Sequence, residues 1–373
     1  MKIGNDATAL AKAREFFDDT MYAMVDYRLS FEAPIGPTGF PGFQSLKNVV
    51  ARLDPVQRAL FRLFRLGEAV GADAVEAAIP SEVLDALGRV GLLERQGEEW
   101  RTPNLLLVPV EGVLVFVSIP PSYATATAPC RAWFDLSSYV FAKALPGELT
   151  SQRVLDVCSG TGVQSLLCAR RGATSVTGLE LDSDAVEIAV CNAAFNRLST
   201  SVEFRQSDKL AALKSSERFD LILCNGPYAP VTDGSEAVSS LGAIGNRLLM
   251  TIINDLPGRL AAGGRGVVAL WRSVGTRSRN EQRSIVESRL AAAGLGCRAF
   301  VDRAQDGIEG MLRILEAEVK QRYGKESGAA AARALLAQVG DAVDGTYNQL
   351  IVFERGSDVR IFGLESPASA KGV

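Results

Sequence analysis

Histidine is absent from this sequence of 373 residues. It is the commonest general base and the commonest metal ligand in proteins, so its absence excludes a serine-hydrolase triad and every histidine-ligated metal site. The six cysteines stand singly, with no Cys-x-x-Cys pair and no spacing that suits zinc. We therefore interpret the cysteines as core thiols and expect no metal ion.

Long apolar runs are missing as well. The longest, Leu105 to Ile119, is interrupted by Pro109, Glu111 and Gly112, and none reaches the ~20 residues that span a bilayer. The first twenty residues also lack the unbroken apolar centre of a secretory signal. We expect a cytoplasmic protein without a membrane partner.

The sequence contains no block of lysines and arginines. The chain has 40 lysines and arginines against 43 acidic residues, a formal net charge of −3. Phosphate contacts supply much of the affinity of nucleic-acid-binding proteins, so this balance makes nucleic acid an unlikely partner. We expect a small-molecule substrate, and we leave open whether the protein forms a homodimer.

The N-terminal third divides into two predicted segments. Residues 1–45 contain a helix, about 5–30, and a Pro/Gly-rich segment, 33–43, which is either a connector or a lid over a substrate cleft. Residues 46–128 contain short helices followed by a β-ribbon, the pattern of a winged-helix-like module. Its helices are rich in acidic residues, which favours a substrate-shaping or dimerising cap over a DNA-binding role.

Residues 129–373 alternate strands with helices. The short β-rich runs RVLDVC, SVTGLE, VEFRQ, FDLILC and GVVALW are separated by helical stretches, which is typical of a doubly wound parallel sheet. A helical insertion, about 305–342, precedes the closing strand YNQLIVFE. We predict an α/β, Rossmann-like fold with seven strands.

Polar residues follow each of the first three strands of this region. Gly160-Thr161-Gly162 forms a tight turn after the first strand, where glycine lets a ligand approach the backbone. Glu180 ends the second strand and can accept both hydroxyls of a ribose, and Asp208 after the third can accept an adenine amine. The predicted nucleoside-binding residues are Asp156, Ser159, Gly160, Thr161, Gly162, Glu180, Leu181, Ser207, Asp208 and Asn225.

The fourth strand ends in the motif Asn225-Gly226-Pro227-Tyr228. Four motifs follow one another along the chain: DVCSGTG, the acid of ELD, the acid of SD, and NGPY. A chain with these motifs in this order resembles the class I S-adenosylmethionine-dependent methyltransferases of the methyltransferase small domain type. NGPY is similar to the Asn-Pro-Pro-Tyr motif of their amino-methylating branch. The resemblance implies S-adenosyl-L-methionine as cofactor and S-adenosyl-L-homocysteine as product.

The resemblance also implies residue roles. In that branch the asparagine side-chain carbonyl, here that of Asn225, and a following backbone carbonyl accept hydrogens from the target nitrogen, while the aromatic ring, here Tyr228, packs on the planar group that bears it. Asn225 and Tyr228 are thus the predicted catalytic residues. The predicted substrate-binding residues are Gly226, Pro227, Phe134 and Asp135.

Gly226 stands where the family usually has proline, which gives the site more room and widens the choice of target nitrogen. The main prediction is an N-methyltransferase that acts on an amine, amide or guanidino nitrogen of a small molecule, such as a free amino acid like arginine or a specialised metabolite. One alternative is a ribosomal RNA or protein-glutamine N-methyltransferase. An alternative of another class is a non-catalytic nucleoside-binding regulatory protein.

Overall fold

The computed structural model describes residues 3–36, 40–128, 130–228, 246–303, 308–310, 337 and 343–355. The chain divides into two compact units, and each is described below by itself. Unit 1 comprises Met1–Ser151 and Ser159–Asp208, and unit 2 comprises Gln152–Cys158 and Lys209–Val373. The predicted domain boundaries at 45 and 128 stay predictions.

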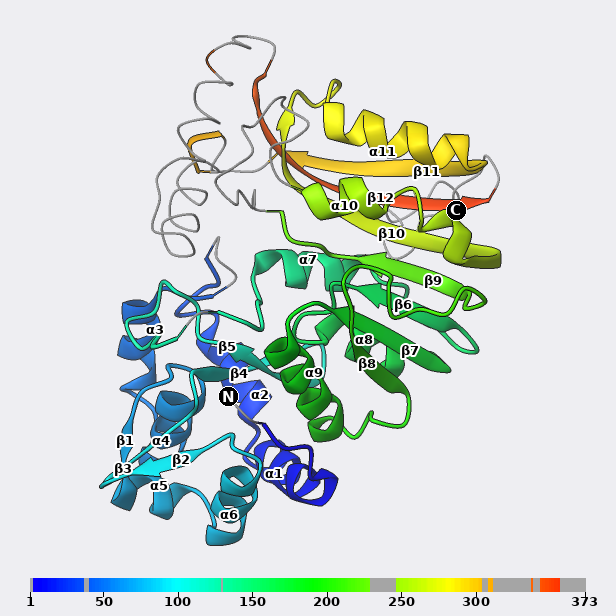
Figure 1. Cartoon of the computed structure of the whole chain (residues 1–373). Coiled ribbons are helices and arrows are strands. Elements are labelled where there is room, and N and C mark those ends of the chain that lie inside the picture. The colour runs from blue at the N-terminus through cyan, green and yellow to red at the C-terminus, as the bar shows by residue number, and fades with distance from the viewer. Residues whose placement is uncertain are drawn as a thin grey trace, which may run out of the picture. The chain divides into compact units, whose positions relative to one another are not determined.

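Unit 1 begins with a mainly helical region, drawn in blue in Figure 1. The predicted helix over about 5–30 is two helices, because Met21 adopts a left-handed conformation (φ 54°) between them. The break buries both Phe17 and Tyr22, whose rings meet edge to face at 5.2 Å. The helices are α1 (Ala7–Asp19), α2 (Tyr22–Leu29), α3 (Phe43–Val50), α4 (Pro55–Phe64), α5 (Ala72–Ala78) and α6 (Ser81–Arg89).

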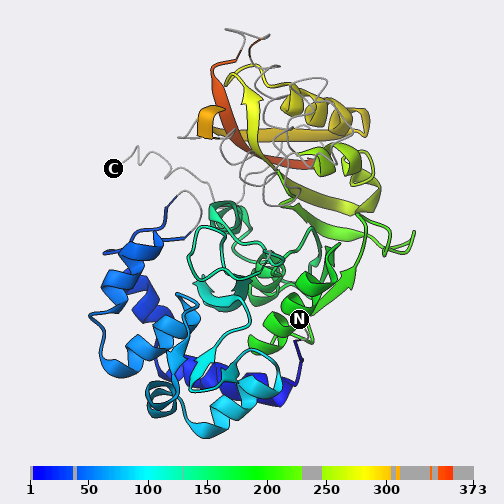
Figure 2. The same ribbon diagram turned by 60° about the vertical axis from the view of Figure 1, so that its left-hand side comes forward.

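Helix α4 begins as the sequence predicts. The Asp54 side chain caps it by accepting a hydrogen bond from Gln57 N at 3.0 Å, and proline occupies the first helical position. Unit 1 also has a three-stranded antiparallel sheet, in the order β1-β3-β2. Its strands are β1 (Val70–Gly71), β2 (Glu94–Gln96) and β3 (Glu99–Arg101). The winged-helix-like module stays a prediction. Figure 2 shows the blue helical region from another side.

A buried hairpin and a parallel strand pair complete unit 1. Strands β4 (Leu105–Val110) and β5 (Val113–Ser118) pair antiparallel, while β7 (Ser175–Glu180) and β8 (Val202–Gln206) pair in parallel. Helices α7 (Leu136–Ala144), α8 (Val163–Arg170) and α9 (Ser183–Phe195) belong to the same unit. Near the Pro/Gly-rich segment, of which 37–39 lie outside the described residues, Phe40 is buried against the rings of Tyr123 and Phe134.

In unit 2, five strands follow the order β11-β12-β10-β9-β6. Pairs β6–β9 and β9–β10 are parallel, whereas β12 runs antiparallel to both of its neighbours. Figure 1 shows helix α11 alongside β11 and β10. The elements are β6 (Arg153–Val157), β9 (Phe219–Cys224), α10 (Arg247–Ile252), a 3-10 turn (Pro257–Arg259), β10 (Leu260–Gly275), α11 (Glu281–Ala292), β11 (Leu295–Arg303) and β12 (Gly345–Arg355).

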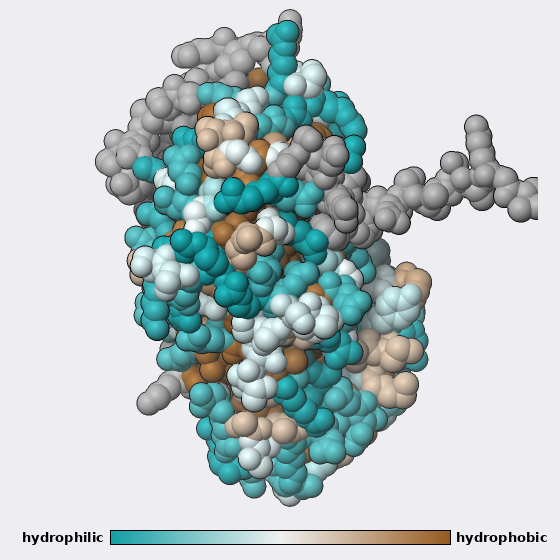
Figure 3. Space-filling model, turned by 90° about the vertical axis from the view of Figure 1, so that its right-hand side faces the viewer, coloured by the Kyte–Doolittle hydropathy of each residue, from teal (hydrophilic) through white to brown (hydrophobic). Residues whose placement is uncertain are grey.

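Parallel strand pairs occur in both units, β7–β8 in unit 1 and β6–β9 and β9–β10 in unit 2, which confirms the predicted α/β, Rossmann-like fold. The predicted insertion at about 305–342 lies outside the described residues, apart from 308–310 and 337. Among the described residues no helix is long and apolar enough to cross a membrane. The face in Figure 3 carries mostly hydrophilic residues, with apolar ones in small separate spots.

Candidate active site

The predicted nucleoside-binding residues of unit 1 surround a tight loop, Ser159–Gly162. Gly162 caps α8 in a left-handed conformation (φ 79°), and a Cβ there would lie 2.5 Å from the Phe204 ring. Glycine is therefore required at this position, for conformation and for space. The loop is joined to the neighbouring strand by a hydrogen bond from Ser159 N to Leu179 O at 3.0 Å.

Glu180 ends β7 with both carboxylate oxygens held by backbone amides. Gly160 N donates to Oε2 at 2.9 Å, while Leu181 N and Asp182 N donate to Oε1 at 2.8 and 3.1 Å. These bonds fix the carboxylate against the glycine loop. Because an ionised carboxylate has about four acceptor positions, capacity remains for a ligand hydroxyl.

Ser207 and Asp208 follow β8 at the same end of the β7–β8 pair. Ser207 N donates to Glu180 O at 2.7 Å, which ties this segment to the end of β7. Asp208 and Leu181 are exposed, the latter by 64%. The strand ends of unit 1 thus hold a fixed carboxylate, an exposed carboxylate and an exposed apolar side chain. Their contact with an adenosine stays a prediction.

Two buried hydroxyl groups in the loop bear on whether a cofactor fits. Ser159 is 3% exposed and Thr161 1%, and neither hydroxyl oxygen has a hydrogen-bond partner among the described residues. Leaving a buried polar group unpaired costs ~1–3 kcal/mol, so such groups point to a ligand that satisfies them. Together with Glu180, they fit the polar part of S-adenosylmethionine.

Asn192 is a site residue that we did not predict. It is fully buried in α9, where its Nδ2 donates to Thr161 O at 2.9 Å and to Phe116 O at 3.0 Å. Its Oδ1 accepts from Phe116 N at 2.7 Å. Asn192 thereby links the glycine loop to the edge of β5. The available signal was an asparagine inside an otherwise apolar helix, AVCNAAF.

Phe134 and Asp135 have clear local roles in unit 1. Asp135 caps α7, accepting from Ser137 N at 2.8 Å through Oδ1 and from Trp133 Nε1 at 3.0 Å through Oδ2. Phe134 is buried, with its ring 4.8 Å from that of Tyr139. Their predicted contact with a substrate stays a prediction.

In unit 2, Asn225 follows β9 directly. Its Oδ1 accepts a hydrogen bond from Trp271 Nε1 at 2.6 Å. An indole N–H can only donate, so this bond fixes which end of the Asn225 amide faces Trp271. The oxygen keeps a second lone pair for another donor. Asp156 is buried at the end of β6, in register with Leu223 of β9.

Strand β10 is irregular at Trp271. Leu270 pairs with Gln349 and Ser273 with Tyr347, so Trp271 and Arg272 share a single partner on β12. Arg272 takes a left-handed conformation (φ 50°). An extra residue of this kind bends a strand and redirects its side chains, and such bulges are frequent beside active sites.

Asn246 joins the other end of the motif to the same tryptophan. It is buried, and its Nδ2 donates to Trp271 O at 2.9 Å while its Oδ1 accepts from Trp271 N at 3.0 Å. Its backbone N donates to Tyr228 O at 3.2 Å. The motif is therefore held at both ends, Asn225 and Tyr228, by a network through Trp271 and Asn246.

Gly226 does not need to be glycine for conformation or space. Its φ lies outside the left-handed region, and a Cβ there would meet Cys224 Sγ at 3.6 Å and Cys158 Sγ at 3.8 Å, which are ordinary contacts. Pro227 is exposed, and Tyr228 is half-buried. The departure from Asn-Pro-Pro-Tyr is thus not forced by the surrounding residues.

Comparison with known proteins finds one family model that matches the central region. Residues 125–279 match the model of the methyltransferase small domain. A protein of Methanocaldococcus jannaschii named "Putative protein N5-glutamine methyltransferase MJ0928" is 33% identical over 132 residues, covering 34% of this chain and 64% of that protein. The release factor glutamine methyltransferase of Aliivibrio fischeri is 37% identical over 95 residues, covering 25% and 32%.

The tRNA1(Val) (adenine(37)-N6)-methyltransferase of Vibrio vulnificus is 39% identical over 79 residues, covering 21% of this chain and 33% of that protein. The chain thus spans 64% of the first relative and about a third of the other two. A solved methyltransferase in complex with SAH, SMU.776, is 13% identical with a TM-score of 0.45, covering 75% of this chain and 66% of that one.

These relatives contradict one of our predictions. They are named for a release factor, protein glutamine and tRNA, so the expectation of a small-molecule substrate, with nucleic acid unlikely, was wrong. The physical reason is that we used the charge of the whole chain, which conceals charge concentrated in one segment. Residues 260–303 contain eight arginines and three acidic residues.

The catalytic type that the four strand-end motifs predict agrees with these matches. Residues 125–279 match the methyltransferase small domain, and the relatives described above are named as methyltransferases, the type that the motifs resemble.

Proposed function

We propose that the protein methylates a planar nitrogen of a macromolecule, either the side-chain amide of a protein glutamine or a base of RNA. The relatives named for protein glutamine and for tRNA adenine support this choice, since both targets are nitrogens on planar groups. The observation that carries the proposal is the fixed amide of Asn225, whose Oδ1 is oriented by Trp271 at 2.6 Å.

Asn225 holds the target nitrogen. Its Oδ1 uses the lone pair that Trp271 leaves available to accept one N–H hydrogen, and a following backbone carbonyl accepts the second. These two bonds turn the nitrogen lone pair away from the acceptor oxygens and stabilise the positive charge that develops on nitrogen. When bound, S-adenosylmethionine supplies an electrophilic methyl group that leaves sulfur, with the bonding electron pair staying on sulfur. A proton then leaves the methylated nitrogen to water, so no histidine base is required.

The ring of Tyr228 packs on the planar group that bears the nitrogen. A flat amide or base fits an aromatic face better than a flexible amine does. On the cofactor side, Glu180 accepts the ribose hydroxyls, and the hydroxyls of Ser159 and Thr161 gain partners. The predicted cytoplasmic location, the cap role of residues 46–128 and the lid over 33–43 stay predictions.

A transfer assay with tritiated S-adenosylmethionine tests the proposal. Bulk tRNA, ribosomes, purified release factors and a metabolite extract are offered separately to the wild type and to Asn225→Ala. We expect label in one macromolecular fraction with the wild type and little with the variant. Label confined to metabolites would refute the macromolecular substrate. Tight cofactor binding without transfer to any fraction would favour a nucleoside-binding regulatory protein.

A further inference from the structure

One segment of unit 2 is positively charged. Residues 260–303 have an excess of five positive charges, although the whole chain carries −3. Every one of these positive charges is an arginine, whose planar fork matches a phosphate better than the ammonium of lysine does. A local field of this kind attracts a polyanion even when the net charge of the protein is negative.

Two of these arginines lie in a loop that extends β10 past the end of β9. The loop consists of Thr276–Arg279 and is called the arginine loop below. Val268 is the last residue of β10 that pairs with β9, opposite Cys224, and the strand continues to Gly275. At ~3.3 Å per residue, the arginine loop begins about 20 Å beyond the end of β9, where Asn225 stands. A small substrate at Asn225 cannot reach it, but an extended one can.

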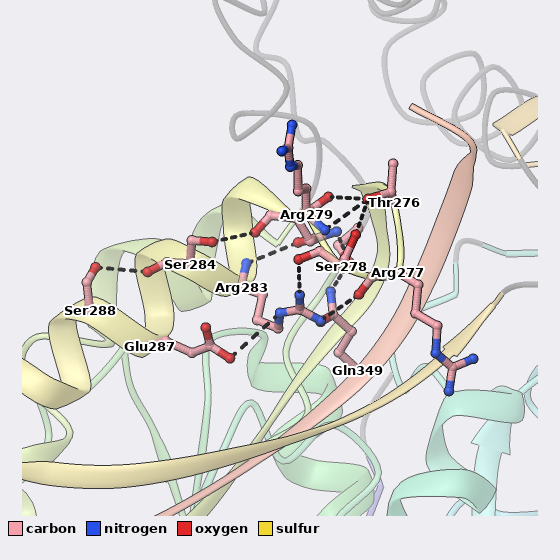
Figure 4. A network of polar contacts seen from close by, with 11 residues as sticks. Thr276, Arg277, Ser278, Arg279, Arg283, Ser284, Glu287, Ser288 and Gln349 are labelled. Carbon is pink, nitrogen blue, oxygen red and sulfur yellow. Dashed lines mark hydrogen bonds and ion pairs between the residues drawn. The ribbon is translucent and has the colours of Figure 1, made fainter. Parts of the chain in front are cut away.

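The arginine loop has a defined internal structure (Figure 4). Thr276 N donates to Arg279 O at 2.8 Å, and Arg279 N donates to Thr276 Oγ1 at 2.9 Å, which closes the turn. Arg283 of α11 donates to Arg277 O at 3.1 Å and to Ser278 O at 2.9 Å. Its side chain is only 13% exposed and lies 3.7 Å from Glu287 Oε1. Arg283 therefore stabilises the loop from inside.

Arg277 and Arg279 have a different orientation. Both are exposed, and Figure 4 shows their guanidinium groups pointing away from the network that Arg283 forms. Within the part of the chain that the structure describes, no side-chain bond or ion pair engages either guanidinium. Glu281 lies two residues further along and is exposed as well, so it reduces the positive charge here without cancelling it.

The composition of the loop distinguishes between two kinds of macromolecule. Its sequence, Thr-Arg-Ser-Arg, contains no apolar side chain. Protein interfaces depend on buried aromatic or aliphatic anchors, whereas contacts to a nucleic-acid backbone are made by arginines, hydroxyls and backbone amides. The loop presents two arginines and two hydroxyl residues, so it suits a phosphate backbone better than a protein surface.

We propose that the arginine loop binds backbone phosphates of an RNA substrate a few nucleotides from the base held at Asn225. A stacked strand advances ~3.4 Å per nucleotide, so about 20 Å corresponds to roughly six stacked nucleotides and to fewer in an extended strand. This inference rests on the proposed function and selects RNA among its two substrate classes.

The test is fluorescence anisotropy with a labelled single-stranded RNA of 20 nucleotides and mixed sequence, between 50 and 200 mM salt. The logarithm of the association constant falls linearly with the logarithm of the salt concentration. Arg277→Ala and Arg279→Ala should each make this slope less steep by ~0.7. At 50 mM salt the double variant should bind severalfold more weakly. The matched control is Arg298→Ala, which removes an exposed arginine from the middle of β11 and should leave the slope unchanged.

Three results would overturn the proposal: no RNA binding by the wild type, an unchanged slope in the double variant, or an equal loss in Arg298→Ala. Tighter binding of a labelled poly-glutamate peptide than of RNA, weakened by the same two substitutions, would assign the loop to an acidic protein instead. Asn225→Ala removes a contact to the base and none to a phosphate, so it should keep the wild-type dependence of binding on salt. If the wild type methylates a protein but does not bind RNA, this inference alone is refuted. If the wild type binds RNA but transfers no methyl group to any fraction, only the proposed function is refuted.

Discussion

Replacing Trp271 by phenylalanine tests whether the orientation of Asn225 matters for methyl transfer. The substitution removes the Nε1 donor that holds Asn225 Oδ1 at 2.6 Å and keeps an aromatic ring at a site that is 4% exposed. A net hydrogen bond is worth ~0.5–1.5 kcal/mol, which converts to roughly a 2-fold to 13-fold change in rate. Because the amide can then rotate, we expect this loss in kcat, with KM for S-adenosylmethionine nearly unchanged.

The assay is steady-state transfer from labelled S-adenosylmethionine, with the concentration of folded enzyme checked by thermal unfolding, since the smaller ring also destabilises the core. Trp100→Phe is the matched control, because it removes an indole whose Nε1 lies 3.4 Å from Glu76 in unit 1. The control should keep its kcat. If Trp271→Phe keeps the wild-type kcat, or loses cofactor affinity as much as turnover, Trp271 does not position Asn225.

Three further substitutions probe other parts of the account. Glu180→Ala should weaken S-adenosylmethionine binding in calorimetry by about 1.5–3 kcal/mol, because a charged acceptor is lost; unchanged affinity would place the ribose elsewhere. Asn192→Ala should lower the free energy of unfolding in urea by about 1–3 kcal/mol, since it leaves Phe116 N and O without their partner; wild-type stability would contradict this. Gly226→Ala should keep turnover within about threefold, as its Cβ makes only ordinary contacts, and a loss of a hundredfold or more would show that the space at Gly226 is used.

The part of the site that the sequence predicts well lies on single strand ends. Glu180 and Asn225 each follow a short apolar run, and the carboxyl ends of parallel strands are where such folds place ligands. Trp271 and Asn246 could not be found in this way. Trp271 is 46 residues from Asn225 in the sequence, and it lies at a bulge that the β-rich run GVVALW does not reveal.

The substrate prediction failed for a related reason. Charge balance over the whole chain averages the arginines of β10, α11 and β11 with acidic residues of the N-terminal helices. Recognition depends on the field at one surface, which a sum over the chain does not describe. Counting charge by predicted segment would have revealed the excess in residues 260–303.

The most direct test of the central claim is single-turnover methyl transfer by Asn225→Ala with the macromolecule that the wild type labels. The account predicts a rate about a hundredfold or more below wild type with little change in cofactor affinity, because the lost acceptor acts as charge develops on nitrogen. It also predicts that mass spectrometry of the wild-type product places the methyl group on a nitrogen of a planar amide or base. Full turnover by the variant, or a methyl group on oxygen or carbon, would contradict it.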